Sequence, residues 1–125
     1  MTYALDTRIL AGLEPISMFN PERLRELLDY CHIETVAQGD DPFKAQSMVG
    51  QSVYLVDGEI ELVYQDGNRV VVGARSEWAK YPLGKRQPYI VSATALSESH
   101  LLRIDEELLD RMVTWCQISQ HDRAS

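Results

Sequence analysis

The 125-residue sequence lacks any apolar run of the roughly 18 to 20 residues that a membrane span needs. It also lacks a secretion signal, because residues 1–8 have neither a basic start nor an apolar centre. These two absences predict a cytoplasmic protein with no membrane-bound segment. Positive charge is scarce as well, with 12 Lys and Arg against 19 Asp and Glu and a pI near 4.8. Duplex nucleic acid repels an acidic chain, so we expect no direct DNA binding.

Cysteine is also scarce, since Cys31 and Cys116 are the only two and form neither a CxxC pair nor a zinc spacing. Both lie in stretches with helical periodicity, which predicts two buried thiols, with a bridge between two helices as the alternative. The three histidines are isolated from one another and from acid pairs, so we expect no metal site. The GxSxG, P-loop and GxGxxG patterns are missing too. We therefore expect a binding or interaction domain without catalytic residues rather than an enzyme.

The composition is that of a globular protein, with 45% apolar and 25% charged residues, and its length fits a single domain over 1–125. Apolar residues at helical spacing predict a helix over about 21–31, with Asn20 as its cap and Pro21 at its first position. Weaker periodicity predicts one or two helical turns over about 4–12. A third helix is expected over about 106–117, with an apolar arc of roughly 160°, which is wide enough for a second contact surface.

Between the second and third predicted helices, over about 33–104, the periodicity is typical of strands. Short β-branched and aromatic runs alternate with turn residues and predict seven or so strands. Asp57-Gly58 and Asp66-Gly67 are strong signals for tight turns, because glycine accepts a positive φ without a Cβ clash. This spacing favours a sandwich or roll of antiparallel sheets. The predicted strands are 33–37, 52–56, 59–64, 69–74, 89–96 and 100–104.

Positive charge is concentrated in the segment 75–88, which carries four Lys or Arg and one Glu. Because the whole chain has a formal charge of −7, the remaining residues sum to −10. A loop of this composition either holds a phosphate group or is a solvated turn.

Several segments together resemble the cyclic-nucleotide-binding domain family, the sensor fold of catabolite activator proteins and kinase regulatory subunits. The stretch FNPERLRELL at 19–28 is similar to the helix that opens the domain, and VYLVDGEIEL at 53–62 to its Y-x-[IL]-x-x-G-x-[IV]-x-[ILV] hairpin. VSATA at 91–95 and LLRID at 101–105 resemble its closing strands. The likeness spans about 10–116. It implies a mainly β fold, an antiparallel β-roll or jelly roll (double-stranded β-helix), with N-terminal helices and a C-terminal helix.

In members of this family that bind ligand, a cassette of the form G-E-[LIV]-[AGS], followed by P-R-[ST]-A, holds the cyclic phosphate. The resemblance implies that Glu77 accepts from the ribose and that Arg86 pairs with the phosphate, although counting back from Ala93 gives the second role to Gln87. Ser76 stands where the family has glycine. The ligand-binding residues that the resemblance implies are Ser76, Glu77, Trp78, Ala79, Arg86 and Gln87.

For Trp78, packing in the core is expected rather than stacking on a base, and the segment 81–83 is expected to anchor the loop on the roll. The resemblance implies a regulatory sensor without a resident cofactor. It would bind a cyclic nucleotide or another anionic effector and relay binding through the C-terminal helix to a protein partner or a second copy. The alternative is a degenerate domain without ligand that acts as a protein-interaction or dimerisation module.

Overall fold

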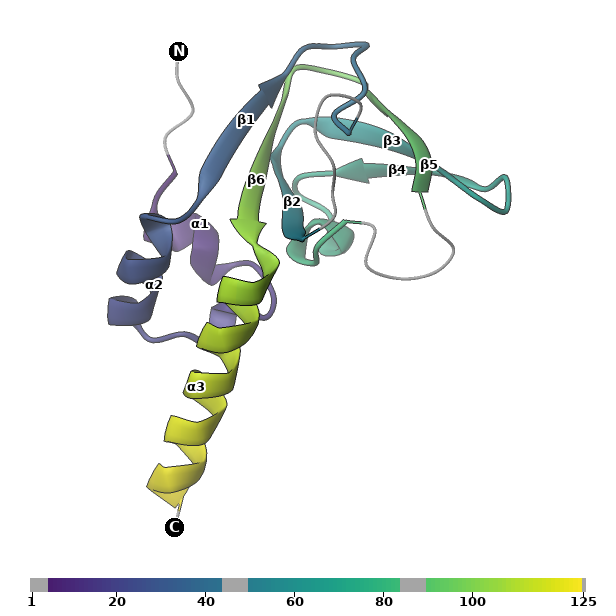
Figure 1. The fold of residues 1–125 in the computed structure, drawn as a ribbon. Coiled ribbons are helices and arrows are strands. Elements are labelled where there is room, and N and C mark those ends of the chain that lie inside the picture. The colour runs from purple at the N-terminus through teal and green to yellow at the C-terminus, as the bar shows by residue number, and fades with distance from the viewer. Residues whose placement is uncertain (1–4, 44–49, 84–89, 125) are drawn as a thin grey trace.

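The computed structural model describes residues 5–43, 50–83 and 90–124. Within these residues the strands lie together on one side of the molecule and the N-terminal helices with α3 on the other (Figure 1). The helices are α1 (Thr7–Ala11), η1 (Ile16–Met18), α2 (Pro21–Leu28), η2 (Glu77–Lys80) and α3 (Glu106–Ala124). The strands are β1 (His32–Val36), β2 (Gln51–Asp57), β3 (Glu59–Tyr64), β4 (Arg69–Gly73), β5 (Ile90–Ala95) and β6 (Ser99–Asp105).

The predicted caps form, but the helix ends differ from the prediction. Asn20 Oδ1 accepts from the backbone N–H of Arg23 at 2.9 Å, and so begins α2. The helix ends at Leu28 and not at 31, because the backbone then tightens to i−3 bonds, such as Tyr30 N–H to Leu27 O at 2.9 Å. The predicted helix over 4–12 is shortened to α1, Thr7–Ala11, with residues up to 4 outside the described ranges.

The C-terminal helix is longer than the predicted 106–117. Asp105 Oδ1 accepts from Leu108 N–H at 2.9 Å, which caps the helix as expected. The helix then continues beyond the predicted end, through polar residues, to Ala124. In Figure 1 it extends away from both sheets.

The described strands form two antiparallel sheets of three strands each, with the orders β1-β6-β2 and β4-β3-β5. We call them sheet A and sheet B. The mainly antiparallel β architecture is therefore confirmed, with six described strands where seven or so were predicted. Both predicted tight turns are present, because Gly58 and Gly67 have φ values of 93° and 89°.

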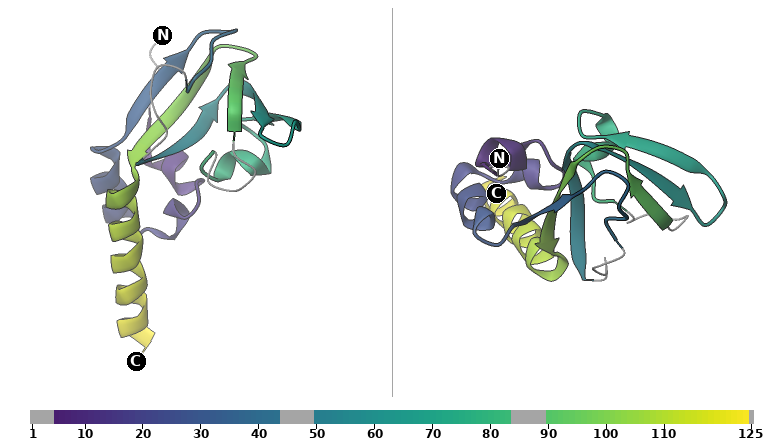
Figure 2. Two further views of the ribbon diagram at one scale, coloured as in Figure 1. Left: turned by 45° about the vertical axis from the view of Figure 1, so that its right-hand side comes forward. Right: turned by 90° about the horizontal axis from the view of Figure 1, so that it is seen from above.

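Sheet A separates two hydrophobic clusters in the described part of the chain. One face of sheet A, with Tyr54, Leu102 and Ile104, packs against the N-terminal helices and α3. We call the buried apolar residues on both sides of this contact the helical cluster. The opposite face faces sheet B, and the residues between the two sheets form the roll cluster. Seen from above, the helices lie on one side of the sheets (Figure 2). The main members of the roll cluster are Val36, Val53, Leu55, Ile60, Leu62, Val72, Ala79, Leu83, Ala93, Ala95 and Leu101.

Candidate functional site

The segment with the cassette-like sequence begins directly after β4. Ser76 precedes η2, and its hydroxyl donates to the carbonyl of Gly73 at 2.7 Å. Its backbone has φ −79° and ψ 161°, which any L-residue adopts. Serine therefore replaces the family's glycine at this position without backbone strain.

Glu77 lies at the start of η2 and points into solvent. Its side chain is 83% exposed, and Oε1 lies 3.3 Å from Nζ of Lys80 in an i,i+3 ion pair. An exposed pair of this kind contributes little to stability, so the carboxylate is free to change partner. Its role as an acceptor for a ribose stays a prediction.

Trp78 and Ala79 lie on opposite sides of η2. Ala79 is buried in the roll cluster, whereas Trp78 is 70% exposed. The expectation that Trp78 packs in the core is wrong. The physical reason is that η2 is a single turn whose inward position is taken by the smaller Ala79.

The chain after η2 is anchored on the roll, as expected. Leu83 is buried in the roll cluster, and its N–H donates to the carbonyl of Val53 on β2 at 2.7 Å. Tyr81, by contrast, stays 47% exposed. Arg86 and Gln87, the two candidates for the phosphate contact, lie outside the described residues. Their roles stay predictions.

Sequence reasoning missed a buried cation inside the roll. Arg103 lies two residues after Leu101 on β6 and so shares its face, which belongs to the roll cluster. Nε donates to Glu34 at 2.6 Å, Nη1 to Gln51 at 2.9 Å and Nη2 to the carbonyl of Pro42 at 3.1 Å. The side chain is 4% exposed. These three partners hold the guanidinium, which ties β1, β2 and the segment after β1 to β6.

A signal for Arg103 was present in the sequence. Arg103 stands in the apolar run of a strand, two places after Leu101. Residues two apart on a strand share a face, so Arg103 is expected on the same buried face as Leu101. A charge at such a position needs a partner of opposite sign. The sequence alone does not identify Glu34 as that partner, because the two residues are 69 positions apart.

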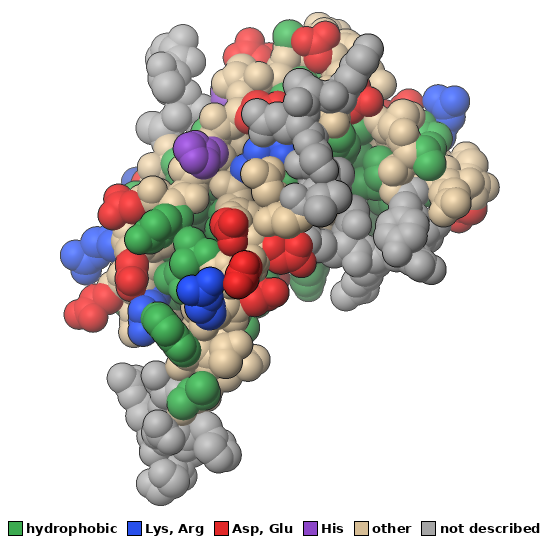
Figure 3. Space-filling view, in the orientation of Figure 1, with side chains coloured by type: hydrophobic (Ala, Val, Ile, Leu, Met, Phe, Trp, Pro, Cys, Tyr) green, Lys and Arg blue, Asp and Glu red, His purple; other side chains and the backbone are tan. Residues whose placement is uncertain are grey.

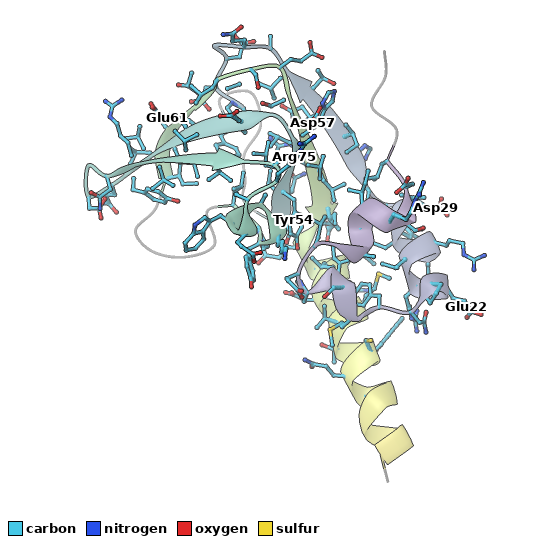
Figure 4. The ribbon with its side chains drawn as sticks, turned by 180° about the vertical axis from the view of Figure 1, so that it is seen from behind. Glu22, Asp29, Tyr54, Asp57, Glu61 and Arg75 are labelled. Carbon is cyan, nitrogen blue, oxygen red and sulfur yellow. The ribbon has the colours of Figure 1, made fainter. Side chains whose placement is uncertain are left out.

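A second buried network joins η2 to the N-terminal helices. The hydroxyl of Tyr54, on β2, donates to the carbonyl of Glu14 at 2.8 Å, and the N–H of Glu14 donates to the carbonyl of Lys80 at 2.7 Å. Tyr54 is fully buried where the sheet meets the N-terminal helices (Figure 4). Burial, followed by the nearby charges of Glu14 and Cys31, raises the pKa of Tyr54. The backbone of one residue, Glu14, thus connects the cassette-like segment to the helical cluster.

The helix α3 packs against the N-terminal helices. The guanidinium of Arg23, on α2, lies 5.4 Å from the ring centre of Trp115, and Cys116 Sγ donates to Met18 O at 3.4 Å. The wide apolar arc expected for this helix leaves Trp115 and Ile118 about half exposed. Figure 3 shows apolar side chains among charged ones on the surface over α2 and α3. Use of this surface by a partner or a second copy stays a prediction.

Both cysteines are free thiols, and each is only partly buried. The predicted burial is therefore partial, and the alternative of a bridge between helices is not what the structure shows. Cys31 Sγ donates to Leu27 O at 3.3 Å. Burial raises the pKa of Cys31 to about 12, which keeps the thiol protonated and unreactive near neutral pH.

The described residues contain neither a candidate metal site nor a helix that could span a membrane. No three or more His, Cys, Asp or Glu side chains come together there in a way that could hold a metal ion. Among the helices of residues 5–43, 50–83 and 90–124, none has the length and apolar character to cross a membrane.

Comparison with solved structures identifies the fold. The sensor domain of the transcriptional regulator DNR from Pseudomonas aeruginosa superposes with a TM-score of 0.65 at 14% identity, covering 95% of this chain and 92% of that one. A cyclic nucleotide-binding-like protein from Brucella abortus gives 0.61 at 26% identity, covering 87% and 97%. The cAMP-bound PfPKA-R gives 0.58 at 16% identity, covering 84% and 42%. No protein-family model and no curated protein sequence matches the chain.

The chain therefore has the β-roll fold of the cyclic-nucleotide-binding-like domains. The resemblance drawn from its sequence is confirmed at the level of the fold. These neighbours include the sensor domain of a transcriptional regulator and a cyclic nucleotide-binding-like protein.

Proposed function

We propose that this chain is a regulatory sensor domain, not an enzyme, that binds a cyclic nucleotide or another anionic nucleotide in the roll and relays binding through α3. The observation that carries the proposal is the position of η2, which belongs to both halves of the fold. Ala79 packs in the roll cluster, and the carbonyl of Lys80 accepts from Glu14 beside the helical cluster.

The relay follows from contacts on both sides of Glu14. If a ligand moves η2, the bond from Glu14 N–H to Lys80 O has to move or break. Glu14 leads into η1, whose Met18 carbonyl accepts from Cys116 on α3. A ligand that prefers one position of η2 therefore shifts the population of α3 positions, which a partner can read.

The affinity has to come from several groups. A hydrogen bond to a charged group contributes about 1.5 to 3 kcal/mol, whereas micromolar binding needs about 8 kcal/mol. Arg86 alone therefore does not suffice. Backbone donors near Ser76, the carboxylate of Glu77 and the other Lys and Arg of 75–88 have to add to it, in keeping with the local charge excess.

Calorimetry with cyclic AMP, cyclic GMP and cyclic dinucleotides tests binding. We expect the wild-type chain to bind at least one of them and Arg86→Ala to weaken that binding by about 10- to 150-fold. Arg69→Ala is the matched control, because Arg69 is an exposed arginine whose ion pair is with Glu61 on sheet B. Absence of heat with every ligand at high micromolar protein would overturn the proposal.

The relay has its own measurement. The chain has two tryptophans, so Trp78→Phe leaves Trp115 as the fluorescent reporter of α3. We expect ligand to change the Trp115 emission, because its ring packs under Arg23 of α2. Binding without any change at Trp115 would leave a binding domain without a relay through this helix.

The exposed apolar side chains of α3 favour a second candidate function, an interaction module that works without ligand. Trp115 and Ile118 would form its contact surface with a partner or a second copy. Light scattering tests this function, because Ile118→Glu should dissociate a dimer and so lower the molar mass that is measured in solution. A wild-type chain that is strictly monomeric, and with which no binding partner is recovered, would count against it.

A further inference from the structure

Strand β4 forms one edge of sheet B, and part of its backbone hydrogen-bonding groups point away from the sheet. In an antiparallel pair, only every second residue exchanges hydrogen bonds with the residue opposite. The N–H of Ala74 donates to the carbonyl of Gly58 at 3.0 Å, so in this register the even-numbered residues make the bonds between β3 and β4. The odd-numbered residues Arg69, Val71 and Gly73 therefore direct their N–H groups outward. No described strand pairs with β4 on that side.

This edge lacks the features that usually protect an edge strand, such as a bulge, a proline or a lysine. β4 pairs with β3 without a register shift, and its sequence RVVVG contains neither proline nor lysine. The other edge of sheet B differs, because the pairing of β5 has a register shift and its residue Ala95 bonds Gly39 N–H at 2.7 Å and the Asp40 carbonyl at 2.9 Å. On β4, Val70 and Val71 are instead 38% and 51% exposed. An exposed apolar edge of this kind is a template for a further strand.

A second copy of β4 fits this edge, because the strand is centred on Val71. When two β4 strands pair antiparallel with the two Val71 residues opposite each other, Arg69 of each copy lies opposite Gly73 of the other. Val70 then lies opposite Val72, which covers its exposed side chain. No like charges face each other in this register. The two Arg69 residues are four positions, or about 13 Å, apart along the strands, which exceeds the Debye length of about 8 Å at physiological salt.

The charges beyond the two ends of β4 also match. Arg75, just after β4, is exposed, and none of the ion pairs between described residues involves it (Figure 4). Asp66, in the turn just before β4, is exposed and accepts only from Asn68 of its own turn. Because the pairing is antiparallel, the end of one β4 lies beside the start of the other. Arg75 of each copy is therefore brought close to Asp66 of the other, and their opposite charges favour this register.

We propose that β4 is a docking surface for a second copy of this chain, which joins the two B sheets into one antiparallel sheet with the order β5-β3-β4-β4-β3-β5. The surface lies on sheet B and apart from α3, so it differs from the contact surface at Trp115 and Ile118 (Figure 1). The inference requires no ligand. An edge of five residues buries less than the roughly 1,200 Å² of a stable interface, so we expect a weak dimer with a dissociation constant of about 10 to 500 μM.

The test measures the molar mass of the full chain in solution. Sedimentation velocity between about 10 μM and 1 mM should show a shift from 14.2 kDa towards twice that mass. Val71→Lys should weaken the dimer by about 5- to 50-fold, because two like charges then lie opposite each other. Val71→Glu should do the same, and an equimolar mixture of the two variants should form a heterodimer. Val91→Lys is the matched control, since Val91 is an exposed valine on β5 and its replacement should leave the mass unchanged.

Each outcome decides the proposal or its register. A wild-type chain that stays a monomer at the highest concentration would overturn the proposal. A dimer that Ile118→Glu dissociates and Val71→Lys does not would assign the contact to α3 and overturn it as well. If both Val71 variants are monomeric and their mixture does not associate, the register centred on Val71 is wrong. Association of the mixture would support that register and would also show that both variants are folded.

Discussion

Sheets A and B have the same number of described strands and the same antiparallel pairing, but very different burial. Sheet A lies between the helical and roll clusters, so its central strand β6 is buried from Ser99 to Ile104. Sheet B has the roll cluster on one face only, and its edge strand β4 exposes Arg69 through Val71. A strand covered on both faces cannot leave a charge unpaired, whereas a strand with one open face can. The same type of residue should therefore matter far more in sheet A.

The largest difference is expected between two arginines. Arg103→Met in sheet A removes the cation from Glu34, Gln51 and the carbonyl of Pro42, and should lower the free energy of unfolding by about 3 to 5 kcal/mol. Arg69→Met in sheet B removes an exposed pair with Glu61 and should cost less than about 1 kcal/mol. Urea unfolding of the two variants measures both values, and equal losses would contradict the comparison.

The next difference is between two glycines with nearly the same backbone. Gly58 and Gly67 both have positive φ, so alanine strains either turn by about 1 to 2 kcal/mol. At Gly58, which ends the turn after β2, a Cβ would also lie 2.7 Å from the Cα of Ser99, whereas at Gly67 it meets nothing within 4 Å. Gly58→Ala should therefore cost a further 1 to 3 kcal/mol or so. Thermal unfolding measures the loss of stability in each variant. If Gly67→Ala lost as much stability as Gly58→Ala, the positive φ and not the contact with Ser99 would account for both losses.

A smaller effect is expected from two tyrosine hydroxyls. Tyr54→Phe in sheet A leaves the carbonyl of Glu14 without its donor and should cost about 1 to 3 kcal/mol. Tyr64→Phe in sheet B is the control, because Tyr64 packs beside the roll cluster and no hydrogen bond of its hydroxyl occurs among the described residues. Denaturant unfolding should separate them. Hydrogen exchange should also show faster exchange of the Lys80 region only in Tyr54→Phe.

The effect that is smallest near neutral pH is a pH dependence from the helical cluster. Burial raises the pKa of Cys31 from 9.0 to about 12, so the folded chain keeps the proton at pH values where the unfolded chain loses it. The folded state is favoured fully below pH 9, and this contribution declines as the pH rises from 9 towards 12. Cys31→Ala should flatten the stability curve in this window. An unchanged slope would mean that Cys31 ionises freely in the folded state.

Local signals in the sequence predicted much of the fold. The cap at Asn20, the proline at position 21 and the bounds of β3 at 59–64 were read correctly, because each depends on neighbours within a few residues. The site was predicted less well. Trp78 was expected in the core but is exposed. Its exposure depends on which side of η2 faces the roll, and a helix of four residues is too short for a hydrophobic periodicity to show that side.

The sequence by itself determined the order of the elements, the tight turns at Gly58 and Gly67 and the basic composition of 75–88, because short-range sterics, hydrogen bonding and charge are written in neighbouring residues. Only the tertiary structure decided that Arg103 meets Glu34 across 69 positions and that Glu14 joins η2 to the N-terminal helices. Those contacts arise when sheet A is covered on both faces, since burial then requires each charge and each backbone carbonyl to find a partner from a distant part of the chain.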